Sequence, residues 1–368
     1  MPEDRRSSTY LLVATGKVRS AIVQPLQTVT IETLQCCRYH LEQFNRTSEM
    51  TSCDGIRVAI GTNALGKPGA GHDIGTKLEA AKRQGFQGVE VAIECLEAHS
   101  NTDDFSNNSM GREERLKAAA SDIHKRARAF DLQIVALNPF GAYDGLVEEE
   151  DIVSRLQEGK LWIELCNALH APILQIASCI YPLHKSKRLT PDIPKIAANM
   201  RRLGELAHLH GITVAFEAVA WGIHLHKWQH IRAVLAEVRL PNVQYCLDTF
   251  HIAAVEAGDP FNKEKPVRDD GHKRLERSLE DLRKTVRAGE IGYFQLSDAI
   301  AADKEQKGYP VRDLEQPPFM TQSRNCRVFP GEGSLPVLPV AKAVFDTGYR
   351  GWVSMEVFHP DLWSKEKT

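Results

Sequence analysis

Four side chains that could bind a metal ion stand at or near the ends of four successive apolar segments. They are Glu217 in AFEAV, Asp248 in YCLDTF, Gln295 in YFQLSD and Glu356 in SMEVF. For any one of them alone, a solvated strand end would be the simpler explanation. Three carboxylates held together repel one another, however, and a divalent cation is the simplest way to offset that repulsion. Carboxylates with one amide suit Mg²⁺, Mn²⁺ or Co²⁺ better than a thiolate-seeking ion, so we expect a metal site that can stabilise an enolate.

Two further groups that could take part in chemistry accompany these segments. His251 follows Asp248 by three residues, and its imidazole titrates close to neutral pH, which suits proton transfer. The segment SRNCRVFPGEG carries Ser323, Arg324 and Arg327 ahead of a Pro/Gly-rich turn. Two arginines in such a loop suit the capture of a carboxylate or a phosphate. A solvated surface loop would explain the same arginines equally well.

Other candidate sites have weaker patterns. Glycines 69 and 71 precede a predicted helix, but the next glycine, Gly75, falls one residue too late for a dinucleotide-binding loop. The His-x-His pairs at residues 208–210 and 224–226 have no suitably spaced cysteine, so we do not expect a zinc site. Three titratable residues near the first two predicted strands could line a pocket, although a structural role is simpler for each: His72, Glu90 and His99.

The elements that must position these residues alternate regularly between short apolar strands and amphipathic helices. Seven predicted helices, with buried positions three and four residues apart, separate the strands. Most strands are continuous apolar runs, as parallel strands covered on both faces should be. A doubly wound open sheet would also alternate, but eight units favour closure into a (β/α)8 TIM barrel, whose active sites lie at the carboxyl ends of the strands. The predicted strands are residues 56–62, 88–94, 132–138, 173–178, 212–218, 243–248, 291–298 and 351–357.

The sequence divides into an N-terminal extension, residues 1–50, and a barrel domain, residues 51–368. Residues 31–44 could form a short accessory helix, and the rest of the extension reads as disordered or as a cover for the barrel's lower face. No secretory or organelle-targeting signal is recognisable in it. Because residues 358–368 are too few for a full eighth helix, we expect that the extension could take its place.

Composition limits the partners and the compartment. The 46 Lys+Arg residues nearly balance 48 Asp+Glu, a net charge of −2, which argues against nucleic acid or a membrane surface as a partner. No apolar run approaches the roughly 18 residues that span a membrane. The eight cysteines include no C-x-x-C pair, which favours buried free thiols and a cytoplasmic location. We expect a small-molecule substrate, and the composition is compatible with a homo-oligomer.

With these residues in view, the chain resembles the 3-dehydroshikimate dehydratases of the xylose isomerase-like TIM barrel superfamily. The motifs that carry the resemblance are FEAVAWGIHLHKW, YCLDTFHIA, FQLSDA, SRNCRVFPGEG and GWVSMEVFHPD, in the family's order and within residues 56–360. One departure concerns the substrate: some members have an arginine directly after the Pro-Phe that ends the third strand, where this chain has Gly141.

The resemblance implies roles for individual residues. His251 matches a proposed acid/base beside the metal, and Ser323 and Arg327 match residues that hold the substrate. We also expect Arg327 to act with His251 in catalysis and the neighbouring Arg324 to contact the substrate. His224, in WGIH, matches a histidine that lines the same pocket. The residues that match the family's divalent-metal ligands are Glu217, Asp248, Gln295 and Glu356.

The expected activity is a metal-dependent lyase reaction, the dehydration of 3-dehydroshikimate to protocatechuate in quinate and shikimate catabolism. An isomerase or epimerase acting on sugars or hydroxypyruvate could use the same metal site. An inactive barrel kept as a binding protein is the third alternative, although none of the four expected ligands is lost. The metal site alone does not separate dehydratase from isomerase, and only the resemblance of residues 323–333 favours the dehydratase.

Overall fold

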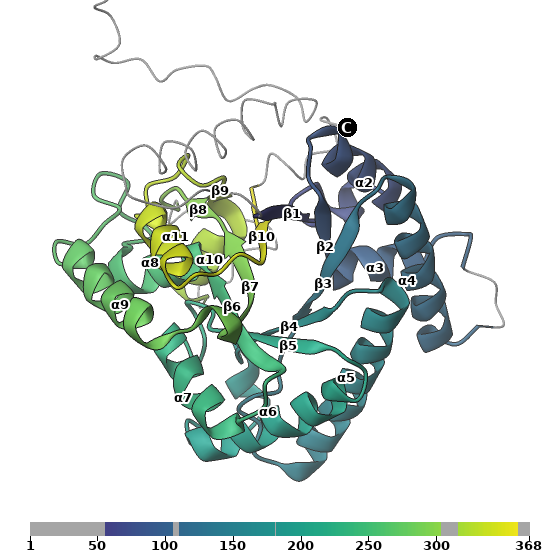
Figure 1. The fold of residues 1–368 in the computed structure, drawn as a ribbon, viewed down its shortest axis with the longest axis horizontal. Coiled ribbons are helices and arrows are strands. Elements are labelled where there is room, and N and C mark those ends of the chain that lie inside the picture. Colours follow the sequence, from purple (N-terminus) through teal and green to yellow (C-terminus); the bar gives the residue numbers. More distant parts are fainter. Residues whose placement is uncertain (1–55, 106–109, 181, 303–315, 360–368) are drawn as a thin grey trace, which may run out of the picture.

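Eight parallel strands close into a barrel in the computed structural model, which describes residues 56–105, 110–180, 182–302 and 316–359 (Figure 1). Around the barrel the order is β1-β10-β7-β6-β5-β4-β3-β2, so successive long strands are neighbours. This arrangement confirms the predicted TIM barrel. The strands are β1 (Arg57–Gly61), β2 (Gly88–Ala92), β3 (Gln133–Phe140), β4 (Ile173–Ala177), β5 (Thr213–Glu217), β6 (Val243–Asp248), β7 (Ile291–Leu296) and β10 (Trp352–Met355).

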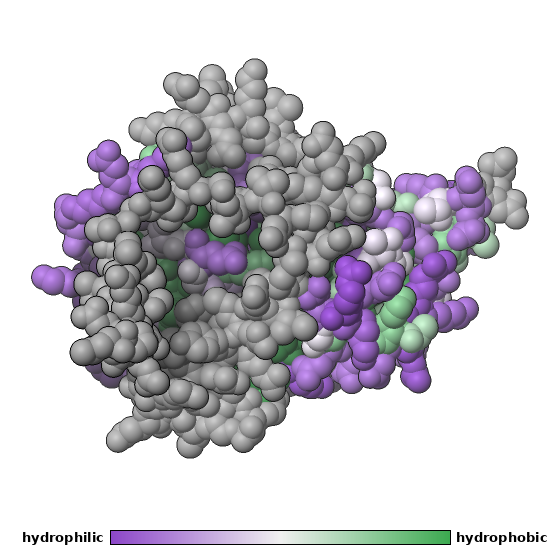
Figure 2. Space-filling model, turned by 90° about the horizontal axis from the view of Figure 1, so that it is seen from above, coloured by the Kyte–Doolittle hydropathy of each residue, from purple (hydrophilic) through white to green (hydrophobic). Residues whose placement is uncertain are grey.

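Helices surround the strands (Figure 1), and most of them bury one face against the barrel. In α9, for example, Leu275, Leu279 and Leu282 are buried at spacings of four and three residues, while the charged side chains between them face outward. The surface of the described residues in Figure 2 is accordingly largely hydrophilic. The helices are α2 (Ile74–Arg83), α3 (Ile93–Ser100), α4 (Arg112–Ala129), α5 (Glu149–Leu169), α6 (Ile193–His208), α7 (Trp228–Val238), α8 (Thr249–Ala257), α9 (Gly271–Thr285), α10 (Pro318–Cys326) and α11 (Val337–Asp346).

Three of these helices, α3, α8 and α10, were not expected from the sequence. The predicted second strand was too long, because Ile93 and Glu94 belong to α3, which begins directly after β2. Helix α8 begins directly after β6, and all nine of its residues are buried. A helix buried on every side shows no amphipathic period, so its sequence looked like a loop. All three lie where the chain passes the carboxyl ends of the strands.

A short pair of antiparallel strands holds the segment that follows β7. Strands β8 (Asp298–Ala299) and β9 (Arg327–Val328) pair antiparallel, and α10 lies between them in sequence. The Asp298 carboxylate accepts hydrogen bonds from the backbone amides of Gly333 at 3.2 Å and Leu335 at 3.0 Å. A Cβ at Gly333 would stand 2.3 Å from Asp298 Oδ1, so this contact requires glycine. The strand pair, in which Arg327 lies opposite Ala299, thereby fixes Arg327 at the barrel mouth.

The remaining sequence predictions concern the chain ends and the surface. The extension at residues 1–50 and its predicted helix lie outside the described residues, as do residues 360–368. None of the described helices is both long and apolar enough to cross a membrane. Among described residues the large exposed apolar side chains are scattered over the surface: Met110, Val153, Leu209 and Ile300.

Candidate functional site

The strand ends bring the expected oxygen ligands to one rim. Glu217 and Asp248 are the last residues of β5 and β6, Gln295 lies one residue before the end of β7, and Glu356 directly follows β10. The register of β6 and β7 sets Asp248 opposite Gln295. All four residues are buried, with exposed fractions of 4%, 1%, 0% and 8% in the order given. Four neighbouring strands therefore deliver four polar side chains into one dry space.

Two of the expected ligands lie together with His251. Glu217, Asp248 and His251 each offer an atom within 4.8 Å of the others, the only such group of three or more ionisable ligands among the described residues. Glu217 Oε1 is buried and accepts no hydrogen bond from any described group, whereas Oε2 accepts one from Gln175 Nε2 at 2.6 Å. A buried carboxylate oxygen left without a donor is costly unless a cation meets it. The donor set thus fits a divalent cation.

The charge balance of the cluster is negative. Burial, followed by the charges of Glu356 and Asp248, raises the pKa of Glu217 well above its ordinary value. Burial likewise raises the pKa of Glu356, although Arg327 opposes the change. Both carboxyl groups therefore resist ionisation in this crowded and buried setting, and a bound cation would favour their ionised forms.

Arg327 supplies the positive charge that the cluster itself contains. The side chain is 1% exposed; its Nη2 donates to Asp248 Oδ2 at 2.6 Å, and its Nη1 donates to Glu356 Oε2. The guanidinium lies over the Phe250 ring, 4.5 Å from its centroid. Burial works to lower the pKa of Arg327, but the neighbouring carboxylates outweigh it and raise that pKa. Both terminal nitrogens of the guanidinium thus donate to expected metal ligands. Its Nε is buried and has no partner among the described groups.

His251 is placed by the helix that follows β6. Asp248 caps α8, its Oδ1 accepting from the amides of Phe250 at 2.5 Å and His251 at 3.2 Å. The Ala220 amide donates to His251 Nδ1 at 3.0 Å, so the neutral ring carries its proton on Nε2. That Nε2 lies 3.5 Å from Glu217 Oε1. Burial, then Arg327, lowers the pKa of His251 well below its ordinary value, which keeps the ring neutral.

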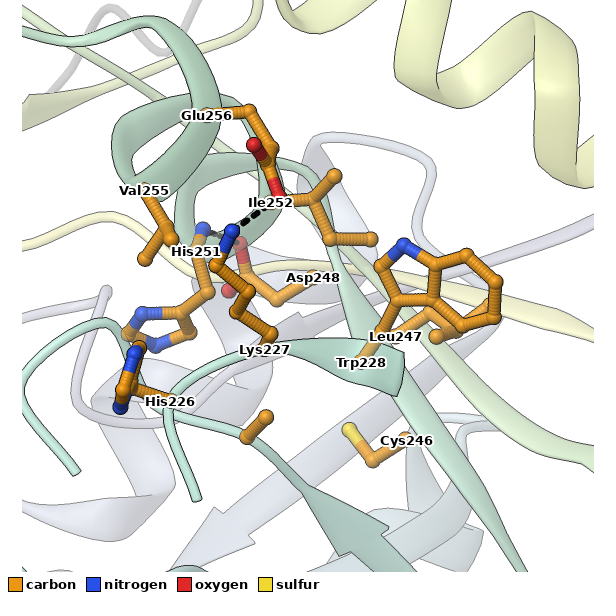
Figure 3. A pocket seen from close by; sticks show the side chains of 11 residues that line it. His226, Lys227, Trp228, Cys246, Leu247, Asp248, His251, Ile252, Val255 and Glu256 are labelled. Carbon is orange, nitrogen blue, oxygen red and sulfur yellow. Dashed lines mark hydrogen bonds and ion pairs between the residues drawn. The ribbon is translucent and has the colours of Figure 1, made fainter. Parts of the chain in front are cut away.

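A pocket beside this cluster joins α8 to the loop after β5 (Figure 3). Asp248 and His251 line it together with His226 and Lys227 from that loop. Lys227 Nζ donates to Glu256 Oε1 at 3.0 Å, which ties the loop to the end of α8. The ion pair therefore holds the loop that carries the WGIH motif against the helix that carries the imidazole.

The expected substrate-binding residues are less directly connected to the cluster. Ser323 is buried on α10, and Arg324 follows it, partly buried. His224 is partly buried in the loop before α7, and burial lowers its pKa. Within the described part of the chain, no hydrogen bond or ion pair joins these three residues to the carboxylates. Their proposed contact with a substrate stays a prediction.

Several polar residues under the site were not expected to support its ligands. Glu90 is completely buried on β2. Its carboxylate accepts hydrogen bonds from Gln295 Nε2 at 3.0 Å, from Tyr293 Oη and from Asn138 Nδ2. Burial raises the pKa of Glu90. Gln175, on β4, holds Glu217 from below. Each is a polar residue inside an otherwise apolar strand, and that interruption was the signal available in the sequence.

Two weaker candidates from the sequence lie apart from the cluster. His72 and His99 line a separate cavity beside α2 and α3. The glycines at 69 and 71 belong to a short 3-10 turn, Pro68–Ala70, and its cap. The expectation of free buried thiols is confirmed for the five described cysteines: Cys95, Cys166, Cys179, Cys246 and Cys326.

The position expected to matter for the substrate, Gly141, has an arginine beside it from another element. Arg155, on α5, donates from Nε to the Gly141 carbonyl at 2.8 Å. Its guanidinium lies over the Phe140 ring, 4.1 Å from the centroid. A guanidinium therefore reaches this part of the rim although residue 141 has no side chain.

Comparison with known proteins gives consistent results. A family model described as xylose isomerase-like TIM barrel matches residues 78–368. A 3-dehydroshikimate dehydratase of Neurospora crassa is 32% identical over 315 residues, which are 82% of this chain and 86% of that protein. A 3-dehydroshikimate dehydratase of Pseudomonas aeruginosa is 24% identical over 284 residues, 77% of this chain but 36% of that longer protein. A solved fusion of a xylose isomerase-like barrel and a 4-hydroxyphenylpyruvate dioxygenase superposes with a TM-score of 0.61 at 21% identity. The match covers 83% of this chain and 39% of the fusion, and it supports the fold alone.

Proposed function

Because the chain belongs to the xylose isomerase-like TIM barrel family, we propose that its barrel mouth dehydrates 3-dehydroshikimate to protocatechuate. The observation that carries the proposal is the relationship to the Neurospora dehydratase over 82% of the chain. The enzyme is a hydro-lyase that acts on a hydroxylated cyclic keto acid. Its product is aromatic, so the elimination of water is effectively irreversible.

Glu217, Asp248, Gln295 and Glu356 would hold the divalent cation, which is Mg²⁺, Mn²⁺ or Co²⁺. When bound, the cation polarises the ketone and stabilises the negative charge that develops on its oxygen. Gln175 and Glu90 support this set from inside the barrel, since each hydrogen-bonds one expected ligand. Such supporting contacts orient ligands and matter for affinity.

His251 handles a proton at Nε2. The Ala220 amide occupies Nδ1, so Nε2 is the ring atom that holds the transferable proton. This atom faces the cluster, where its N–H can donate a hydrogen bond to the oxygen of the departing hydroxyl group. Arg327 offsets part of the negative charge of the rim by pairing with Asp248 and Glu356.

The test is direct: purified protein is incubated with Mg²⁺ or Mn²⁺ and 3-dehydroshikimate, and the ultraviolet absorbance of protocatechuate is followed. Appearance of the chromophore in the presence of metal, and its loss after chelation, would support the proposal. The Glu217→Gln variant, which changes one oxygen of the cluster and nothing in the loop at 323–333, should produce no chromophore. If 3-dehydroshikimate is unchanged while a ketose or hydroxypyruvate is isomerised, the dehydratase assignment is wrong.

A further inference from the structure

A second cavity lies outside the barrel mouth, between the loop after β1, the start of α2 and helix α3. Its volume is about 180 Å³. Its inner wall contains His72, Lys77 and Cys95, all buried, whereas Gly71 and Thr102 on its rim are exposed. The cavity therefore extends from exposed residues to a buried inner wall.

Lys77 is an unusual residue to find in that wall. Its side chain is 1% exposed, and Nζ donates to the Gly66 carbonyl at 2.8 Å and to Cys95 Sγ at 3.1 Å. Among the residues that the structure describes, no carboxylate forms an ion pair with it. Buried ammonium groups ordinarily have a partner of opposite charge. Of the two partners of Lys77, the Gly66 carbonyl is chemically inert, whereas the Cys95 thiol can be oxidised and stands 3.1 Å from the amine.

His72 indicates that the cavity takes a polar molecule. The residue is 5% exposed, and the Lys67 amide donates to its Nδ1 at 3.0 Å, so the neutral ring carries its proton on Nε2. Burial, and then Lys77, lowers the pKa of His72, which favours this neutral form. Nε2 is buried and has no partner among the described groups. A donor in this position suits a small ligand that presents an acceptor oxygen.

We propose that the Cys95–Lys77 pair is a site of oxidative modification, at which a small peroxide oxidises the thiol and the amine then closes a covalent S–N cross-link between α3 and α2. The proposal uses no residue of the barrel mouth and does not depend on the function proposed above.

Both steps balance chemically. The Cys95 sulfur attacks one peroxide oxygen, the O–O bond breaks, and the departing hydroxide leaves as water, giving a sulfenic acid. The sulfur is oxidised by two electrons and the peroxide is reduced. The neutral Lys77 amine then attacks that sulfur, an S–N bond forms, the S–OH bond breaks, and hydroxide takes the amine proton. In total, a thiol, an amine and one peroxide give a sulfenamide and two waters.

Two other buried cysteines, Cys166 and Cys246, lack this combination. Burial raises the pKa of the Cys166 thiol, and it raises the pKa of the Cys246 thiol together with nearby carboxylates. The sulfurs of these residues contact the Ile173 carbonyl and the Gln295 amide oxygen, respectively, and not an amine. They are internal controls within the same molecule, because protonated buried thiols react slowly.

The experiment treats the full-length protein with hydrogen peroxide, digests it without reductant and maps the peptides by mass spectrometry. The expected result is a cross-linked pair of peptides that contain Lys77 and Cys95, lighter by two hydrogens than their sum and separated by a thiol reductant. Cys166 and Cys246 should remain reduced in the same digest. If Cys95 stays reduced, or ends as a sulfinic or sulfonic acid with Lys77 unmodified, the proposal is wrong.

Two variants give an independent check. Cys95→Ser keeps a hydrogen-bonding group beside the amine but cannot form the cross-link, and Lys77→Met keeps the thiol but removes its partner. Oxidised wild type should unfold at a higher temperature than reduced wild type, because the cross-link joins two elements, whereas Cys95→Ser should show no such shift. An equal shift in Cys95→Ser would contradict the proposal even if Lys77→Met fails to fold.

Discussion

The backbone amide of Ala220 donates a hydrogen bond of 3.0 Å to Nδ1 of His251, and this contact assigns the two nitrogens of the ring different tasks. Nδ1 is an acceptor within the protein, so only Nε2 can exchange a proton with a substrate. The ring also packs beside Trp221, with 5.1 Å between centroids, which limits its rotation. The proposed role of His251 therefore rests on a single ring atom of fixed orientation.

If His251 transfers a proton, His251→Ala should lower kcat by roughly 10²–10⁴ with little change in KM. His251→Gln should be equally impaired, because an amide can donate a hydrogen bond at this position but cannot give up its proton. Steady-state kinetics on both variants with 3-dehydroshikimate measures this. A glutamine variant with near-normal kcat would mean that the residue acts only as a hydrogen-bond donor.

Glu217→Gln should abolish metal-dependent activity and leave the barrel folded. The substitution removes one of several crowded carboxyl groups whose pKa is raised by burial, so it relieves repulsion while it preserves an acceptor for Gln175. Activity assays and thermal unfolding of the metal-free protein measure the two effects separately. Loss of folding together with activity would show that Glu217 has mainly a structural role.

Arg327→Ala should destabilise the metal-free protein by about 3–5 kcal/mol, because Asp248 and Glu356 lose the buried cation that pairs with them. Added Mn²⁺ should recover part of that loss by supplying positive charge to the same carboxylates. Arg155→Ala is the matched control, since that arginine donates to the Gly141 carbonyl and its substitution should respond little to metal. Chemical unfolding with and without Mn²⁺ gives the comparison. If Mn²⁺ stabilises both variants equally, Arg327 does not act on the metal site.

The sequence predicted the strands and the rim residues because both signals are local. Each strand is a short apolar run, and Glu217 and Asp248 interrupt the apolar pattern at a strand end. The pairing of Arg327 with Asp248 joins residues 79 positions apart, and no local pattern encodes it. Glu90 was visible as a polar residue in a strand, but its contact with Gln295 depends on barrel closure. Local chemistry was predictable, whereas the partners of each charge were not.

Asp144 should make stability depend on pH. It is 2% exposed, and burial raises its pKa from 3.8 to about 6, although it accepts a hydrogen bond from the Cys179 amide. The pKa of Asp144 is higher in the folded than in the unfolded protein, so ionising this group lowers the free energy of unfolding. This loss of stability is absent below pH 3.8 and reaches its full size above about pH 6. Asp144→Asn keeps the acceptor and removes that cost, so it should be more stable than wild type by about 2–3 kcal/mol near pH 8 and by little near pH 4. Urea unfolding across this range tests the sign, and a difference that does not change with pH would contradict it.

A chain that begins at Met50 should fold and retain activity. All eight barrel strands and every proposed site residue lie within residues 56–359, and β1 closes the barrel by pairing with both β10 and β2. The strand order is thus complete without residues 1–49. Thermal unfolding and dehydratase kinetics of the shortened and full-length proteins provide the comparison. An insoluble or inactive shortened protein would show instead that residues 31–44 cover the barrel or replace its final helix, as the sequence also allowed.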